Sequence, residues 1–153
     1  MTVIYGDTEK IASWMRLVRK VRDNFPGLDT EEDIIDHEKT VLRFMHEHRA
    51  VCVMDKDETV GVLLFSKKHN SICFLAVAPE HRRQGIASAL LKRAIAELDA
   101  RCDITVSTFR AEDEKGTAPR ALYKKFGFAE DALTVEFGYP NQVFVLHPRN
   151  GTI

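Results

Sequence analysis

The first third of the chain has the spacing of two amphipathic helices. Apolar side chains recur three or four residues apart at Ile11, Trp14, Met15, Val18, Val21 and Phe25. Pro26 ends this stretch, and Thr30 with Asp33 then has the spacing of a capping box for a second helix. The apolar face of the second helix, which runs to about His48, is formed by Ile34, Val41, Leu42 and Met45. A short strand, Val3 to Tyr5, is expected before both helices.

From residue 51 onward the pattern changes to short apolar runs separated by polar turns. Three consecutive strands of an antiparallel meander are expected at Val51 to Met54, Val60 to Phe65 and Ser71 to Val77. The third run carries apolar residues on both faces of the expected strand, which is typical of a strand in the middle of a sheet. Later strands are expected at Asp103 to Thr108, from Phe128 onward, and at Val143 to His147.

Two further helices are interleaved with these strands. Pro79 ends the third strand, and a helix is predicted from about Gln84 to Ala100. The order strand, helix, strand implies a parallel crossover. Another helix is expected from Thr117, as its cap, to Phe126, with Gly127 in the left-handed conformation that closes it. The predicted fold class is α/β (an α+β mixed sheet), with a central, mostly antiparallel sheet flanked by about four helices.

Length and composition favour a single domain over residues 1–153. The chain is 44% hydrophobic, which is enough to build one core at this length. The formal net charge is −1, so no basic excess indicates a nucleic-acid or anionic-membrane partner. No apolar run approaches the ~20 residues that span a bilayer, and the first residues do not resemble a signal peptide. We therefore expect a cytoplasmic protein.

The cysteines and histidines do not indicate a metal site. The three cysteines, Cys52, Cys73 and Cys102, include no Cys-x-x-Cys pair and are predicted to be reduced interior residues. His46 and His48 are two positions apart, so on a helix they would point to different faces. No metal cofactor is expected.

The strongest functional signal lies between Leu75 and Leu91. A buried strand ends there in a turn that opens a long helix, and the turn residues are first basic and then small. The first four N–H groups of a helix have no partner within it, and together with the helix dipole they form an anion site. Because Gly85 and Ala87 lack bulk, a large anion can approach the main chain, and successive N–H groups can hold a diphosphate.

This turn reads Arg82-x-x-Gly85-x-Ala87, which resembles the acetyl-coenzyme A signature of the Gcn5-related N-acetyltransferase (GNAT) superfamily. The stretch from Ala121 to Phe128 contains Leu-Tyr followed by Gly-Phe and resembles that superfamily's other motif. The order of elements over nearly the whole chain is also similar to the GNAT fold. The resemblance implies an N-acetyltransferase that uses acetyl-coenzyme A as cosubstrate, without a metal, and acetylates a primary amine by direct attack.

The resemblance also implies a role for each matching residue. Main-chain groups of the third strand would hold the pantetheine arm, and the turn and helix start would hold the diphosphate. The cofactor-binding residues are therefore expected to be Leu75, Ala76, Val77, Arg82, Arg83, Gln84, Gly85, Ile86, Ala87 and Ser88. Tyr123 is the expected catalytic residue, near the thioester sulfur, where its hydroxyl would donate a hydrogen bond to the leaving thiolate. Gly116 and Pro119 stand where the motif often has Asn and Ala, so one side-chain contact to the cofactor is expected to be missing.

The sequence leaves the acceptor and the general base open. No spacing selects a base among Glu31, Glu32, Asp36, Glu112, Asp113 and Glu136. The expected acceptors are a polyamine, an aminoglycoside, an amino acid or a peptide terminus. The acidic stretch from Asp29 to Glu38 is typical of a solvated helix start; the alternative is that it attracts a cationic small molecule. The edge strands near the C-terminus are compatible with a homodimer. The alternative function is a catalytically silent module of the same fold that binds or senses acetyl-coenzyme A, or an interaction domain.

Overall fold

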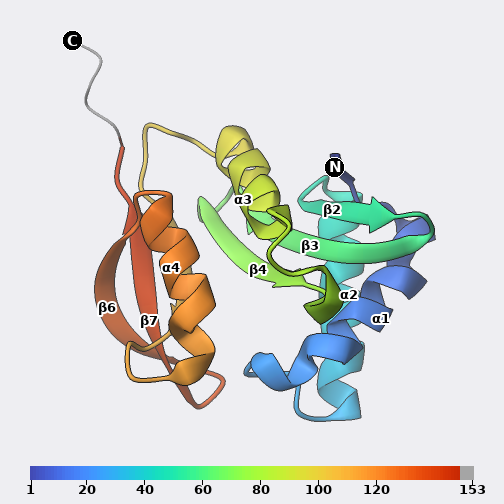
Figure 1. The fold of residues 1–153 in the computed structure, drawn as a ribbon, viewed down its shortest axis with the longest axis horizontal. Helices are drawn as coiled ribbons and strands as arrows, with labels where there is room; N and C mark the ends of the chain where they lie inside the picture. The colour runs from blue at the N-terminus through green and yellow to red at the C-terminus, as the bar shows by residue number, and fades with distance from the viewer. Residues whose placement is uncertain (149–153) are drawn as a thin grey trace.

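The computed structural model describes residues 1–148, which form a seven-stranded sheet with helices packed against it (Figure 1). The strands are β1 (Val3–Tyr5), β2 (Ala50–Asp55), β3 (Glu58–Ser66), β4 (Ser71–Val77), β5 (Ile104–Phe109), β6 (Ala129–Glu136) and β7 (Tyr139–Leu146). Their order in the sheet is β1-β2-β3-β4-β5-β7-β6. All neighbouring strands are antiparallel except β4 and β5, so the predicted mixed, mostly antiparallel sheet is confirmed.

The described residues contain four α-helices: α1 (Ile11–Val21), α2 (Glu31–His46), α3 (Ile86–Glu97) and α4 (Thr117–Lys125). Four 3-10 turns, η1 (Thr8–Lys10), η2 (Arg22–Asn24), η3 (Pro79–His81) and η4 (Glu114–Gly116), adjoin the helices or precede them. Helices α1 and α2 lie behind strands β2 to β4 in Figure 1, and α3 lies in front of them. A Cβ atom on Gly61 would come within 2.5 Å of Ile86, so this glycine allows α3 to pack directly on β3. None of the helices in residues 1–148 is long and apolar enough to cross a membrane.

Two local sequence signals are confirmed by the backbone. Thr30 and Asp33 form a reciprocal capping box at the start of α2, which satisfies main-chain N–H groups that the helix itself leaves free. Gly127 has a φ of +94° and closes α4, because a residue without a Cβ atom enters this region at no steric cost.

Three predicted boundaries are wrong. Helix α3 begins at Ile86 rather than Gln84, because Arg83 and Gly85 have positive φ angles of 64° and 79°. It ends at Glu97 rather than Ala100, since Leu98 is already extended. Thr117 is not a cap but the first helical residue of α4, and the N-cap position is Gly116.

The last strand begins at Tyr139 rather than Val143, and it lies between β5 and β6. Pro140 and the polar residues after it concealed this start, since proline is rare within sheets. Pro140 lies beyond the last β5–β7 pair, Phe109 with Asn141, so β5 requires no N–H from it. Strand β6 forms one of the two edges of the sheet, and the pairing of two copies there stays a prediction.

The predicted burial of the cysteines is correct only for Cys52. Cys73 and Cys102 are exposed. Cys73 lies on β4, where this strand separates from β5, and Cys102 lies in the turn before β5. Both side chains are therefore left uncovered, although their neighbours in the sequence are apolar.

Candidate functional site

A wedge-shaped gap opens between the two parallel strands in the middle of the sheet. Strands β4 and β5 are paired only where they begin, at Ser71 and Thr105, so they separate toward Val77 and Phe109. The N–H of Ala78 donates to the carbonyl of Val60, and peptide groups alternate in direction along a strand. The N–H and C=O groups of Leu75 and Val77 therefore point into the gap.

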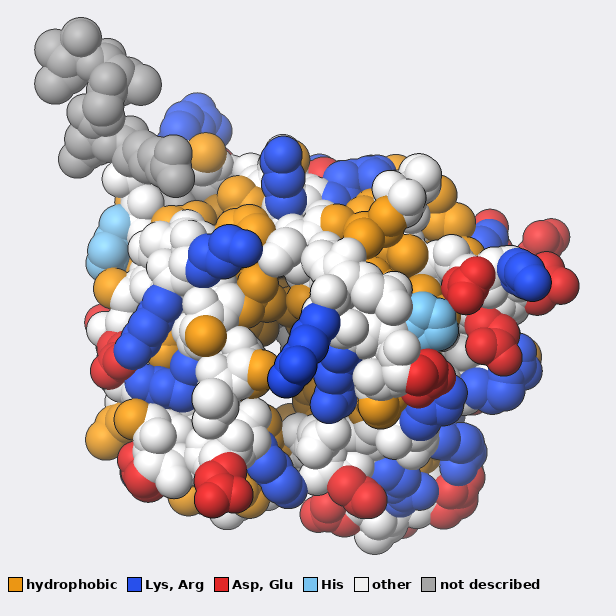
Figure 2. All heavy atoms as spheres, in the orientation of Figure 1, with side chains coloured by type: hydrophobic (Ala, Val, Ile, Leu, Met, Phe, Trp, Pro, Cys, Tyr) orange, Lys and Arg blue, Asp and Glu red, His pale blue; other side chains and the backbone are white. Residues whose placement is uncertain are grey.

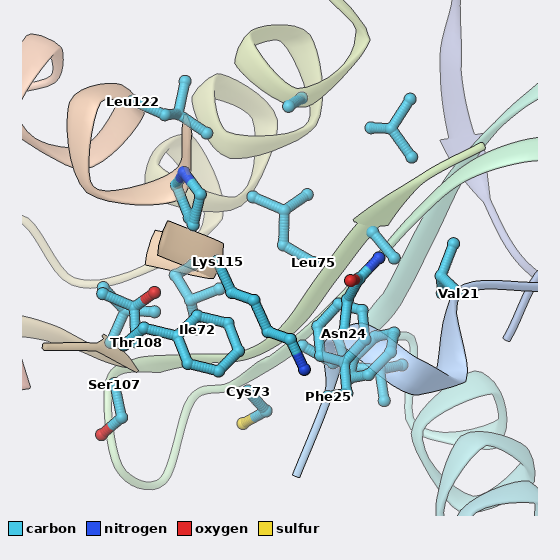
Figure 3. A pocket seen from close by; sticks show the side chains of 18 of the residues that line it. Val21, Asn24, Phe25, Ile72, Cys73, Leu75, Ser107, Thr108, Lys115 and Leu122 are labelled. Carbon is cyan, nitrogen blue, oxygen red and sulfur yellow. The ribbon is translucent and has the colours of Figure 1, made fainter. Parts of the chain in front are cut away.

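The gap is part of a cavity of about 1240 Å³, whose wall includes residues of β4, β5, α2 and α4 (Figure 3). Figure 2 shows the molecule hollowed near the centre of this face, with Lys and Arg side chains beside the opening. All of the predicted cofactor-binding residues line the cavity except Gln84, which is exposed in the turn. Tyr123 lines it from α4.

The turn before α3 presents main-chain donors without acceptors. The N–H groups of residues 83 to 88 have no acceptor within residues 1–148, and no side chain caps the helix. The first N–H with a main-chain partner is that of Ala89, which donates to Gly85 at 3.0 Å. Arg82 and Arg83 are exposed and form no ion pair with another described residue. The turn is therefore a concentrated positive site beside the cavity.

The same turn is fixed to the rest of the molecule on both sides. Lys20 of α1 forms an ion pair with Glu80 at 2.7 Å. The His81 ring lies 3.2 Å from a carboxylate oxygen of Asp55, the last residue of β2. These exposed contacts contribute little stability each, but they restrict the positions that the turn can adopt.

Tyr123 stands on the opposite wall of the cavity. Its side chain is 4% exposed, and its ring packs against those of Phe128 and Phe144 at centroid distances of 5.6 and 6.1 Å. Burial raises the pKa of Tyr123 above its ordinary value, so the hydroxyl keeps its proton at neutral pH. None of the described residues forms a hydrogen bond with this hydroxyl, which leaves the O–H available to a group in the cavity.

Tyr123 is positioned by a buried arginine that sequence reasoning missed. Arg120 lies one helical turn earlier and donates to the carbonyl of Phe109 at 2.9 Å and to the side chain of Gln142 at 2.8 Å. Its guanidinium also lies 2.8 Å from Glu130 and over the Phe144 ring. These contacts connect α4 to strands β5, β6 and β7. This role was not predictable from the residue pattern, since an arginine on a helix is usually exposed.

The two departures from the second motif have structural causes. A Cβ atom on Gly116 would come within 2.9 Å of Phe109 and 3.1 Å of Arg120, so a larger residue would displace α4 from β5. Pro119 lies in the first turn of α4, where its missing N–H removes no helical hydrogen bond. Pro119 still lines the cavity.

The structure separates the six acidic candidates for a general base. Asp36 and Glu136 line the cavity and have no ion-pair partner among the described residues. Glu31 is paired with Arg19, and Asp113 accepts a hydrogen bond from Tyr139 at 2.7 Å. Neither of the remaining two, Glu32 and Glu112, lines the cavity.

His37 of α2 is a further cavity residue that the sequence did not single out. Its ring lies 4.8 Å from the ring of Phe74 on β4, and its Nε2 atom is buried without a partner within the described part of the chain. Burial lowers the pKa of His37 from 6.5 to about 4, so the imidazole is uncharged at neutral pH.

We expect the free energy of unfolding to fall as the pH is lowered from about 6.5 to about 4, in part because of His37. In this range the unfolded chain binds a proton that the folded chain refuses, which lowers stability by up to about 1.4 kcal/mol per pH unit. Urea unfolding of the wild type and of His37→Phe at several pH values measures how much of the pH dependence comes from His37. The His46→Gln variant on the exposed face of the same helix is the control. An identical pH dependence in wild type and His37→Phe would contradict the assignment.

No group of three or more His, Cys, Asp or Glu side chains able to hold a metal ion occurs in residues 1–148.

Comparison with known families identifies the domain. Residues 46–130, more than half of the chain, match the family model described as an acetyltransferase (GNAT) domain. None of the curated proteins compared with the chain matches it.

Several solved structures share the fold over nearly the whole chain. A GNAT-family acetyltransferase from Bacillus cereus ATCC 10987 is 18% identical, with a TM-score of 0.72, and the match covers 97% of this chain and 98% of that one. The ribosomal-protein-S18-alanine N-acetyltransferase from Escherichia coli is 19% identical, with a TM-score of 0.72 and coverage of 99% and 97%. The PaiA N-acetyltransferase from Thermoplasma acidophilum, solved in complex with coenzyme A, is 13% identical, with a TM-score of 0.67 and coverage of 93% and 96%. At these identities the likeness concerns the fold, and it confirms the GNAT architecture.

Proposed function

The chain belongs to the GNAT family of acetyltransferases, and from that premise we propose that it transfers the acetyl group of acetyl-coenzyme A to a primary amine by direct attack. The observation that carries the proposal is the row of unpartnered N–H groups in residues 83 to 88, beside a cavity that also contains Tyr123. In the protein from Thermoplasma acidophilum the same fold is seen with coenzyme A.

The residues present fit the cofactor at both of its ends. The N–H groups of the turn and of the first turn of α3 would hold the diphosphate, and Arg82 and Arg83 would add charge-assisted bonds. The peptide groups of Leu75 and Val77, where β4 has separated from β5, would bond to the pantetheine arm. When bound, acetyl-coenzyme A supplies an acetyl thioester at the end of this path.

The two walls of the gap then have separate tasks in the transfer. A main-chain N–H at the end of β4 donates to the thioester oxygen, which gains negative charge as the amine attacks. The hydroxyl of Tyr123 donates to the sulfur as the carbon–sulfur bond breaks. Because burial raises the pKa of Tyr123 further above that of a thiol, a hydrogen bond is favoured over early proton transfer.

The attacking amine must first lose a proton. With a lysine-like pKa, neutralising it at pH 7 costs about 4.6 kcal/mol, so a base or an apolar pocket must supply part of this free energy. Asp36 and Glu136 are the acidic candidates that line the cavity and remain unpaired. One of them, directly or through water, is proposed to accept the proton.

Binding and catalysis can be tested separately. We expect coenzyme A to raise the melting temperature, since a ligand at 100 times its Kd adds about 2.7 kcal/mol of stability. We expect acetyl-coenzyme A with an amine panel to release free thiol, measured by its reaction with a disulfide dye, and to give products heavier by one acetyl group. A melting shift without turnover of any amine would favour the silent binding module, and the absence of a shift would reject the cofactor site.

A further inference from the structure

Part of the cavity, which we call the acceptor compartment, is lined mainly by elements that contain none of the predicted cofactor-binding residues. Its wall is made by the loop between α1 and α2, by the cavity-facing side of α2, and by the hairpin between β6 and β7. A second, smaller cavity of about 260 Å³ adjoins it and shares Asn24, Phe25, Pro26, Phe109, Lys115 and Phe137 with it. Figure 1 shows the loop after α1 and the tip of this hairpin facing each other at the lower edge of the molecule. This side offers the acceptor an entrance separate from the turn before α3.

Aromatic rings dominate the compartment. Phe25 packs on Phe74 with ring centroids 4.4 Å apart, and the His37 ring lies 4.8 Å from the Phe74 ring. Because burial keeps the imidazole neutral, His37 adds a flat, uncharged surface rather than a competing cation. The three rings come from the loop, β4 and α2, so the fold brings them together from distant parts of the sequence.

One further ring stands at the entrance. Phe137 lies at the tip of the β6–β7 hairpin and is 81% exposed, although it lines both cavities. A Cβ atom on Gly27 would come within 2.8 Å of this ring, so the hairpin meets the loop at that point. Phe137 and Gly138 both have positive φ angles, as in a tight two-residue hairpin, which fixes the ring at the mouth. An exposed aromatic ring at the mouth of a cavity is available to an entering molecule.

Charge in the compartment is placed next to these rings. Asp36 precedes His37, and Glu136 precedes Phe137, and both carboxylates are unpaired within residues 1–148. The nearby cation, Lys115, donates to the main-chain carbonyl of Asp23 at 2.9 Å and so is turned toward the loop (Figure 3). The compartment therefore combines free negative charge with aromatic surface, which suits an ammonium group attached to an apolar ring.

We infer that the acceptor is a small primary amine carried on an aromatic ring by a short aliphatic linker, and this inference rests on the proposed acetyl transfer. The ring of the acceptor packs between the Phe25–Phe74 cluster and Phe137, and its nitrogen points toward the thioester. Asp36 or Glu136 attracts the ammonium ion before it is deprotonated. A polyamine would place its further charges against the Phe25–Phe74 wall, and a peptide would place its main-chain polar groups there, where the two phenyl rings accept no ordinary hydrogen bond.

The test compares four acceptors at saturating acetyl-coenzyme A: phenethylamine, butylamine, spermidine and a short peptide with a free N-terminus. We expect kcat/KM for phenethylamine to exceed that for each of the others by about tenfold or more, since an aromatic body fills the pocket that the others leave open. Phe137→Ala is expected to lower kcat/KM for phenethylamine about fivefold. The KM for acetyl-coenzyme A and the activity with butylamine should not change.

Val135→Ala is the matched control, because Val135 is an exposed apolar residue of β6, two positions before Phe137, that lines neither cavity. It should leave all four kcat/KM values unchanged. A preference for spermidine, for the peptide or for butylamine, or an equal loss in Phe137→Ala for every acceptor, would overturn the inference while acetyl transfer itself stood. If none of the four is acetylated but another amine of the panel is, the inference falls and the proposed function stands. If no amine of the panel is acetylated although coenzyme A raises the melting temperature, both fall.

Discussion

Ala87→Glu is expected to abolish binding of coenzyme A while leaving the protein folded. Ala87 is the second residue of α3, is half-buried, and lines the cavity beside the unpartnered N–H groups. A carboxylate placed there would occupy the space of the diphosphate and accept hydrogen bonds from the N–H groups that would otherwise bind it. Its negative charge would also repel that of the diphosphate. Like-charge contact of this kind costs several kcal/mol, so we expect the Kd for coenzyme A to rise by about a hundredfold or more.

The fold should tolerate this change, because a negative side chain in the first turn of a helix is favourable by about 0.3–1 kcal/mol. The melting temperature without ligand should therefore be equal to that of the wild type or slightly higher. Ala96→Glu makes the same substitution on the exposed side of α3 near its C-terminal end, outside the cavity lining, and should bind coenzyme A normally. Calorimetric titration of both variants measures the difference. Unchanged affinity in Ala87→Glu would mean that the start of α3 does not hold the diphosphate.

The turn before α3 was predictable because its signals are local. Gly85 at a positive φ, small residues and a helix start all follow from neighbouring positions in the chain, and the same holds for the capping box of Thr30 and Asp33. The exact start of α3 was not predictable, since Arg83 also takes a left-handed conformation that side chains rarely adopt. The predicted start of α3 was therefore two residues too early, and the binding of a diphosphate at this turn stays a prediction.

The acceptor compartment could not be derived in this way. Phe25, His37 and Phe74 looked like ordinary apolar or polar positions of separate elements, and only the packing of α2 and of the loop after α1 against β4 brings them together. Arg120 was missed for a similar reason, because its acceptors come from β5 and β7. Gly138 is a local signal for the hairpin turn that contains Phe137. The start of β7 at Tyr139 was nevertheless not predicted, because Pro140 is an unusual residue within a strand.

Tyr123→Phe is expected to lower kcat by about a hundredfold, within the range for a positioned proton donor. The substitution removes only the hydroxyl, which has no partner among the described residues, and it keeps the ring between Phe128 and Phe144. Stability should change little, because no internal hydrogen bond is lost. The KM for acetyl-coenzyme A should stay within about twofold, since the hydroxyl acts on the sulfur as the bond breaks and not on the bound thioester.

Steady-state assays with one amine at saturation and acetyl-coenzyme A varied separate these two constants. Tyr5→Phe is the control, because the hydroxyl of Tyr5 donates to Glu97 at 2.6 Å outside the cavity lining, and its loss should leave kcat unchanged. Because burial raises the pKa of Tyr123, the wild-type hydroxyl stays protonated through neutral and mildly alkaline pH. The ratio of wild-type to Tyr123→Phe kcat should therefore be constant over that range. Equal kcat values in the two proteins would remove Tyr123 from the reaction and leave it as a core residue that fastens α4 to the sheet.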